Sequence, residues 1–253
     1  MRSTACLLIH GFGGAPFEML SLAEVLRGLG CRVSVPTLPG HATSVADWLT
    51  TGWDDWLACA EQEYLRLSQN HERVFVMGLS MGGSLSLALA QRHAPAGVVA
   101  LAAPVYLYRF WPLDARDWRL PFVGLLRRFK QVWPSAPRSE RSRLMAPWEG
   151  YETGVGLDPL KSLIRGIAQV RRDLGRVTAP LLAMHCPRDA SVPVGNLWEI
   201  MEGVRSPVRY AVPLELDEDV TSKHLLTTHV RCRERVEQLC AWFVREGAEQ
   251  SGR

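Results

Sequence analysis

Ser80 is the residue whose surroundings point most directly to chemistry. It stands at the centre of the segment 78–82, GLSMG, which has the pattern G-x-S-x-G. The apolar run 74–77 precedes this segment and the small, apolar stretch 83–90 follows it, which predicts a strand, a sharp turn and a buried helix. Glycines on both sides leave no Cβ to clash where the chain reverses, so the serine oxygen would stand exposed above a sheet. We therefore predict that Ser80 is a nucleophile.

A serine hydroxyl is a weak nucleophile, so it needs a histidine base, an acid that orients the base, and donors for an oxyanion. In open parallel sheets, ligands bind beyond the carboxyl ends of the strands. Asp189 follows the predicted strand 180–185, and His224 comes after the predicted strand 208–213 and an acidic loop. All three predicted catalytic residues thus follow predicted strands, and they occur in the chain order Ser, Asp, His.

Other acidic residues compete with Asp189 for the orienting role. Asp173 lies inside a helical pattern far from any strand end, and the acidic run 217–219 is typical of a solvated loop. We therefore prefer Asp189 as the acid.

Four other histidines compete with His224 for the role of base. His185 falls at the end of a predicted strand and fits a core residue, and His229 is at the start of the last helix, which it could cap. His10 and His41 are expected to be structural, bonding loop backbone near the site. His224 is the preferred base.

The oxyanion donors are predicted to be two backbone N–H groups. One belongs to Met81, which follows the nucleophile, and the other to Phe12, in the loop after the first predicted strand. Gly11 and Gly13 allow the backbone of this loop to approach a substrate closely. A phosphate-binding loop is the alternative, but the segment 11–16 is not G-x-G-x-x-G and no G-K-[ST] follows nearby. The sequence argues against nucleotide binding.

The elements that must position these residues alternate between strands and helices. Short β-like runs are found at 5–9, 32–35, 73–77, 97–101, 180–185 and 208–213. Apolar residues with helical spacing fill 53–67, 197–204 and 236–244. This alternation predicts a parallel sheet wrapped by one-sided helices.

The alternation breaks after residues 102–104, and a new helix is predicted to start at Asp158, with a proline in its first turn. We expect a core made of residues 1–104 and 159–253, with an inserted cap at 105–158. The cap holds four of the nine tryptophans and several arginines. The tryptophans either line an apolar substrate pocket or pack the cap onto the core, and the arginines fit a solvated face better than an anion site.

Composition limits the other possibilities. A chain of 253 residues with 47% apolar residues can form one large α/β domain or two small ones. A net charge of +3, with no basic face carrying aromatic residues, gives little indication of nucleic-acid binding. The six cysteines form no C-x-x-C pattern, which indicates buried, reduced thiols and no zinc site.

The N-terminal apolar run 5–9 is too short for the core of a signal peptide. Nowhere do about 18 apolar residues follow one another, so no transmembrane helix or stable membrane insertion is expected. The sequence predicts a soluble protein of the cytoplasm.

At this point the chain resembles the bacterial carboxylesterases and monoacylglycerol lipases of the α/β-hydrolase family. The matching residues are 7–14 (LLIHGFGG), 39–41 (PGH), 54–56 (DDW), 78–83 (GLSMGG) and Asp189 with 192–193 (VP). The resemblance runs from the first strand to the last helix and implies the α/β-hydrolase fold, a mostly parallel sheet flanked by helices with a small inserted cap. It implies a serine hydrolase that acts on short or medium acyl esters or monoacylglycerols, with no metal or organic cofactor.

The resemblance also assigns site residues. It gives the triad to Ser80, Asp189 and His224, and the oxyanion donors to Phe12 and Met81. A Tyr-Glu pair near the end of the cap holds the glycerol part of the substrate in monoacylglycerol lipases, which implies a substrate-binding role for Glu152 beside those of Gly11 and Gly13.

The chain departs from related sequences in the loop before the base. The acidic segment 215–219 is longer than expected there. If these carboxylates lie close to His224, they would raise its pKa, which is a hypothesis for the structure to address.

Other functions remain open on sequence grounds. A thioesterase or an acyltransferase would use the same triad, whereas a dehalogenase or epoxide hydrolase would need an aspartate in place of Ser80. A noncatalytic binding protein could share the fold, although the order of the triad argues against it. The natural substrate and the oligomeric state are not determined by the sequence.

Overall fold

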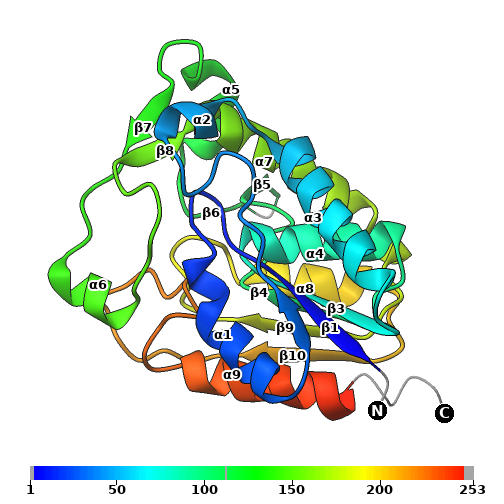
Figure 1. Ribbon diagram of the computed structural model, residues 1–253. Coiled ribbons are helices and arrows are strands. Elements are labelled where there is room, and N and C mark those ends of the chain that lie inside the picture. The colour runs from blue at the N-terminus through cyan, green and yellow to red at the C-terminus, as the bar shows by residue number, and fades with distance from the viewer. Residues whose placement is uncertain (1–2, 112, 248–253) are drawn as a thin grey trace.

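The protein is described here by a computed structural model that covers residues 3–111 and 113–247 (Figure 1). Within these residues the centre of the fold is a sheet of six parallel strands in the spatial order β10-β9-β4-β3-β1-β2. The strands are β1 (Thr4–Ile9), β2 (Arg32–Ser34), β3 (Arg73–Leu79), β4 (Gly97–Leu101), β9 (Leu181–His185) and β10 (Arg209–Pro213).

Helices bury both faces of this sheet. In β1, Ala5, Leu7 and Ile9 pack into the core on one face, while Cys6 and Leu8 pack into the core on the other. Burial on both faces explains why the central strands are continuous apolar runs rather than alternating ones. Figure 1 shows α3, α4, α7 and α8 on one side of the sheet and α1 and α9 on the other.

The helices of the core have the following bounds. They are α1 (Phe17–Gly28), α2 (Val45–Leu49), α3 (Trp53–Ser68), α4 (Met81–Arg92), α7 (Leu157–Arg172), α8 (Gly195–Gly203) and α9 (Arg233–Trp242), with the 3₁₀-helix η2 (Leu174–Arg176) and the π-helix η3 (Phe243–Gly247).

The predicted fold class is confirmed, since every predicted strand lies within two residues of an observed one. Helix α1 was not anticipated as a separate element. Its buried side chains include Met19, Leu22 and Leu26, and this spacing places them on one face against the sheet. Helix α7 begins at Leu157, one residue before the predicted start.

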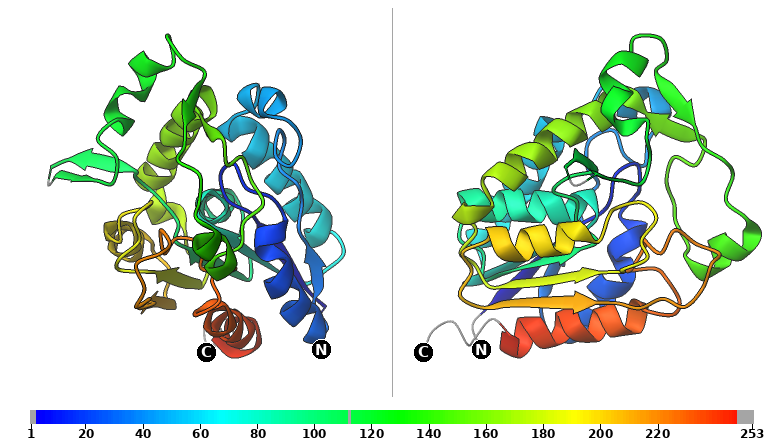
Figure 2. Two further views of the ribbon diagram at one scale, coloured as in Figure 1. Left: turned by 90° about the vertical axis from the view of Figure 1, so that its left-hand side faces the viewer. Right: turned by 180° about the vertical axis from the view of Figure 1, so that it is seen from behind.

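The segment between β4 and α7 is made of short elements. They are β5 (Tyr108–Phe110), β6 (Leu113–Ala115), η1 (Leu120–Phe122), α5 (Val123–Leu126), β7 (Val132–Pro134), α6 (Glu140–Met145) and β8 (Gly154–Gly156). Strands β5 and β6 pair with each other, and so do β7 and β8, both antiparallel. Figure 2 shows this segment, coloured green, extending beyond one end of the sheet.

All six cysteines are free thiols, and Cys6, Cys186, Cys232 and Cys240 are buried. Across the described ranges, the helices lack the combination of length and apolar character needed to cross a bilayer.

Candidate active site

Ser80 occupies a sharp turn between β3 and α4. Its backbone has φ 54° and ψ −119°, a conformation that costs a non-glycine residue about 1–3 kcal/mol. The turn is held by a hydrogen bond of 2.7 Å from the Ser80 N–H to the Leu101 carbonyl. A Cβ on Gly82 would lie 2.0 Å from the Ile9 carbonyl oxygen, and one on Gly78 would lie 2.1 Å from the Gly82 carbonyl carbon. The two glycines of the G-x-S-x-G pattern are therefore required by close backbone packing.

The structure brings His224 and Asp189 together. The imidazole Nδ1 of His224 lies 2.7 Å from Oδ2 of Asp189, and because a carboxylate can only accept, Nδ1 carries the proton and donates it. The other carboxylate oxygen accepts N–H groups from Ser191 at 2.7 Å and Val192 at 3.0 Å. This pattern leaves Nε2 of His224 with a lone pair, as a general base requires.

Charge and burial tune both members of this pair. Burial alone would raise the pKa of the Asp189 carboxyl, but His224 and the hydrogen bond to it, together with His185, hold that pKa well below its ordinary value. Burial alone would lower the pKa of His224, but the Asp189 carboxylate and, more weakly, the charge of Glu18 raise it above its ordinary value. The lowered pKa favours the ionised carboxylate of Asp189, and the raised pKa makes His224 a stronger base.

His185 also contacts this pair. It is buried at the end of β9, as a core residue would be, and its Nε2 lies 3.4 Å from Oδ2 of Asp189 and 3.1 Å from the Val192 carbonyl. Sequence reasoning considered His185 only as a rival base or a core residue. Its position at the end of a strand, four residues before Asp189, was the available signal for this contact.

Two cavities meet at Ser80 and His224. The larger has a volume of about 760 Å³ and the smaller about 240 Å³, and Phe12 borders both. The larger is mostly apolar, with walls that include Leu107, Leu120, Val123, Trp133, Leu157 and Leu160. The smaller is more polar, with walls that include Gly11, Glu18, Arg138, Trp148, Ser191 and Ser222. The candidate nucleophile therefore lies between a mostly apolar space and a more polar one.

Phe12 is distinguished from its neighbours in the loop between β1 and α1 by its N–H group. The Gly11 N–H donates to Glu18 at 2.6 Å, that of Gly13 donates to Nε2 of His41 at 3.1 Å, and that of Gly14 donates to the Gly11 carbonyl. For the Phe12 N–H, no acceptor is recorded among the described residues. A free N–H at the edge of the cavity is what an oxyanion donor needs.

Two histidines fix this loop, as expected from the sequence. Nε2 of His10 accepts the Leu38 N–H at 3.2 Å, and Nε2 of His41 accepts the Gly13 N–H. Each ring therefore carries its proton on Nδ1 and is neutral. Burial lowers the pKa of His10 to about 3 and that of His41 to about 4, in agreement with this role.

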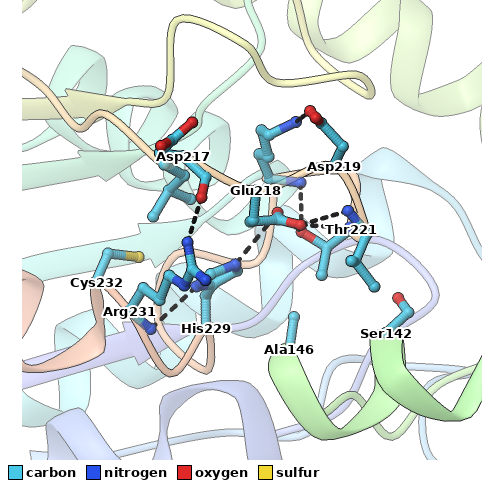
Figure 3. A network of polar contacts seen from close by, with 12 residues as sticks. Ser142, Ala146, Asp217, Glu218, Asp219, Thr221, His229, Arg231 and Cys232 are labelled. Carbon is cyan, nitrogen blue, oxygen red and sulfur yellow. Dashed lines mark hydrogen bonds and ion pairs between the residues drawn. The ribbon is translucent and has the colours of Figure 1, made fainter.

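The loop that presents His224 is held by its own network. Figure 3 shows Glu218 between Thr221 and His229, and its carboxylate accepts the N–H groups of Val220 at 2.5 Å and Thr221 at 2.9 Å. It also accepts the Thr221 hydroxyl at 2.5 Å and lies 3.4 Å from Nε2 of His229.

The three acidic side chains at 217–219 each have a partner. Glu218 bonds its own turn, Asp219 pairs with Lys223 and Asp217 pairs with Arg188. The pKa of His224 is raised, as the sequence hypothesis anticipated, but the charges that raise it belong to Asp189 and Glu18 rather than to residues 215–219.

Glu152 does not belong to the lining of either cavity. Its carboxylate is 2.6 Å from the Arg143 guanidinium, and its neighbour Tyr151 stacks on Trp48 and donates its hydroxyl to the Gly40 carbonyl at 2.7 Å. The substrate-binding role suggested for Glu152 stays a prediction.

The tryptophans of the segment 105–158 differ in whether they line a cavity. Trp133 and Trp148 line the larger and the smaller cavity respectively, and Trp118 borders the larger one although it is 76% exposed. Trp111 is 93% exposed. Among the arginines, Arg127, Arg143 and Arg119 form ion pairs with acidic residues of the same segment, and Arg138 donates to backbone carbonyls.

Sequence reasoning missed Glu18 and the individual role of Arg138 in the smaller cavity. Glu18 is buried at the start of α1, and burial raises its pKa to about 7. An acidic residue in the first turn of a helix that follows a glycine-rich loop was the only signal for it.

The fold, the strained serine at a strand-to-helix turn and the Ser, Asp, His order define a class of protein. The family described as the alpha/beta hydrolase family matches residues 6–226, and this chain belongs to it. The prediction of this family is confirmed.

Particular relatives narrow the comparison. The chain is 34% identical over 209 residues to a thermostable monoacylglycerol lipase of Bacillus sp. (strain H-257), covering 82% of this chain and 79% of the relative. It is 26% identical to a carboxylesterase of Bacillus subtilis (strain 168), covering 73% and 72%. Among solved structures, one from a study of the metagenome-derived lipolytic enzymes LipS and LipT has a TM-score of 0.83 at 25% identity and covers 97% of this chain and 95% of that chain.

Proposed function

We propose that this protein is a serine hydrolase that cleaves carboxylic esters through an acyl-enzyme on Ser80. The class agrees with its relatives, a monoacylglycerol lipase and a carboxylesterase. The observation that carries the proposal is the 2.7 Å hydrogen bond between His224 and Asp189, on a histidine that borders the same cavities as Ser80.

The mechanism follows from the proton positions. Nε2 of His224 takes the Ser80 proton as the serine oxygen attacks the ester carbonyl, and Asp189 stabilises the imidazolium that forms. The oxyanion is bound by the N–H groups of Phe12 and Met81, the latter at the N-terminus of α4, whose dipole adds favourable charge. His224 then protonates the leaving alcohol and later activates the water that hydrolyses the acyl group.

The two cavities suggest where the acyl and alcohol parts of the ester bind. The larger cavity is mostly apolar and would receive the acyl chain, because burial of each CH₂ contributes about 0.8 kcal/mol. The smaller, more polar cavity would receive the alcohol. Residues 105–158 would act as a cap, since they supply much of the wall of the larger cavity.

We further propose that the protein works in the cytoplasm, where its free thiols would stay reduced.

A labelling experiment combined with a substrate series tests the proposal. A fluorophosphonate probe is expected to label the wild-type protein and to leave Ser80→Ala unlabelled. Rates on p-nitrophenyl esters of increasing acyl length, on a monoacylglycerol and on an acyl thioester are then compared. Hydrolysis of the oxygen esters with an optimum at short or medium chains supports the proposal. A clear preference for the thioester, or no labelling and no turnover of any substrate, refutes it.

A further inference from the structure

Glu18 is a buried carboxylate beside the site, and the mechanism above does not use it. It belongs to the first turn of α1, its residue is 2% exposed, and it lines the smaller cavity together with Ser80 and His224. Burying a carboxyl group is costly unless its oxygens are hydrogen-bonded, so its partners should explain its presence.

Those partners come from two separate parts of the chain. Oε2 of Glu18 accepts the Gly11 N–H at 2.6 Å, and Oε1 accepts the indole N–H of Trp148 at 2.5 Å. Gly11 directly precedes Phe12, whose N–H is the proposed oxyanion donor. Trp148 belongs to the proposed cap, at residues 105–158. One carboxylate thus connects the loop between β1 and α1, called here the oxyanion loop, to the proposed cap.

A second contact links the same two segments. The Tyr151 N–H donates to the Gly13 carbonyl at 2.9 Å, one residue beyond Phe12. The close fit also restricts the loop itself, since a Cβ on Gly14 would lie 2.0 Å from Oε1 of Glu18 and 3.1 Å from the Trp148 indole nitrogen. The cap residues 148–151 therefore hold the loop on both sides of the proposed donor.

The side chain at position 18 must accept twice. Two N–H donors converge on it, and a carboxylate offers two acceptor oxygens, whereas a glutamine offers one oxygen and an NH₂ group that cannot accept. Aspartate would be one methylene too short to reach the same two donors. Glutamate is thus the residue type that can accept both hydrogen bonds, from Gly11 and from Trp148.

The charge of Glu18 also reaches the proposed base. The charged groups that border the smaller cavity with it are His224, from the loop after β10, and Arg138, from the cap. Burial raises the pKa of Glu18 to about 7, with the bonds from Gly11 and Trp148 opposing the rise, and the charge of Glu18 in turn raises the pKa of His224. The ionised carboxylate therefore favours the imidazolium that forms during attack.

We propose that Glu18 is a positioning residue that couples the oxyanion loop to the cap, so that the Phe12 N–H is correctly placed only when Trp148 is docked. This inference rests on the proposed esterase function. It assigns to Glu18 an effect on turnover rather than on substrate binding, because an oxyanion forms only in the transition state.

The test uses three variants and one matched control. Glu18→Gln keeps the shape but loses one acceptor and the charge, whereas Trp148→Phe loses only the indole donor and keeps the carboxyl group. The third variant combines both changes. The control is Glu24→Gln, an exposed position on the same helix. All are compared with wild type on a soluble p-nitrophenyl ester across pH, and folding is checked by circular dichroism.

We expect Glu18→Gln to lower kcat about 10- to 100-fold with a KM within about threefold of wild type, less than the loss of an oxyanion donor, which costs about 10²- to 10³-fold. Trp148→Phe should lower kcat by a smaller factor. The double variant should resemble Glu18→Gln alone, since residues that act through one joint are not additive. Glu24→Gln should match wild type.

The pH profile separates positioning from mere structural support. The acidic limb of kcat/KM should move to lower pH in Glu18→Gln, because His224 loses a negative neighbour. It should move less in Trp148→Phe, in which the carboxyl group remains although loss of the indole donor raises its pKa. The inference is wrong if Glu18→Gln keeps the wild-type kcat and profile, or if the two effects on kcat multiply.

Three further outcomes are decisive. If Glu18→Gln does not fold, Trp148→Phe decides alone, and an unchanged kcat in that folded variant overturns the inference. If wild type hydrolyses the ester and Ser80→Ala does not, a failure belongs to Glu18 and not to the proposed function. If wild type hydrolyses nothing, the proposed function itself has failed, and the inference falls with it.

Discussion

At the scale of single residues, the account depends on how three side chains share protons and charge. Ser80→Ala removes the nucleophile and should lower kcat by at least about 10³-fold with no loss of folding, because residual activity would come only from substrate binding and the oxyanion donors. Steady-state kinetics on a p-nitrophenyl ester check this. A loss of only a few-fold would rule out the role given to Ser80.

Asp189→Asn should separate orientation from charge. Asparagine can donate to Nδ1 of His224 and so favours the wrong tautomer, which costs about 10⁴-fold in kcat in a comparable triad. The sign of the pH effect follows from the raised pKa of His224, whose neutral form is the base. Activity rises with pH through that pKa, and removing the carboxylate should move this acidic limb to lower pH. A pH profile of kcat/KM that keeps the wild-type limb would contradict the pairing.

Much of this residue scale could be predicted from sequence. Ser80, Asp189 and His224 each follow a strand, and parallel strands bring the residues after their carboxyl ends to one edge. Glu18 could not be found in the same way. Its importance arises from a contact with Trp148, 130 residues further along the chain, and no local pattern records such a contact.

At the scale of elements, the loop 214–224 must hold His224 in place. The Glu218 carboxylate accepts hydrogen bonds from two N–H groups and a hydroxyl of its own turn and contacts His229. Glu218→Gln places an NH₂ group against these donors and should lower the free energy of unfolding by about 1–3 kcal/mol. Urea unfolding measures this, and Glu215→Gln, an exposed position in the same loop, is the control. Equal stability of the two variants would refute the role of the network.

The Glu218 carboxylate should also affect how the stability of the protein depends on pH. Although burial opposes it, hydrogen bonding lowers the pKa of Glu218 from 4.5 to about 2. A group with a lowered pKa contributes stability that is present above its unfolded pKa and is lost as the pH falls towards its folded pKa. The wild-type protein should therefore lose more stability between about pH 4.5 and pH 2 than Glu218→Gln does.

Elements were predicted with uneven success. The six strands were predicted because short β-like runs alternate with helical patterns along the chain, whereas β5 to β8, of three residues each, fall outside this alternation. Their pairing depends on the cap as a unit, as when β7 pairs with β8 some 20 residues later. Helix α1 has regular apolar spacing, and attention to that spacing would have found it.

At the scale of the whole molecule, the proposed cap at residues 105–158 and α7 together supply walls of the larger cavity. Leu160 of α7 lines it, so Leu160→Trp should shorten the acyl chain that fits. We expect kcat/KM on the longest accepted p-nitrophenyl ester to fall about tenfold or more, equivalent to about 1.4 kcal/mol, with little change on the acetate. Ala168→Trp, at an exposed position of the same helix, is the matched control. An unchanged chain-length profile would show that acyl chains bind elsewhere.

The central claim is that Ser80, His224 and two backbone N–H groups meet at one point, and a crystal structure of the phosphonate-inhibited protein tests it most directly. We predict a covalent bond from phosphorus to the Ser80 oxygen, a phosphoryl oxygen facing the N–H groups of Phe12 and Met81, and Nε2 of His224 within hydrogen-bond distance of the adduct. An adduct on another residue, or a different histidine beside it, would contradict the account.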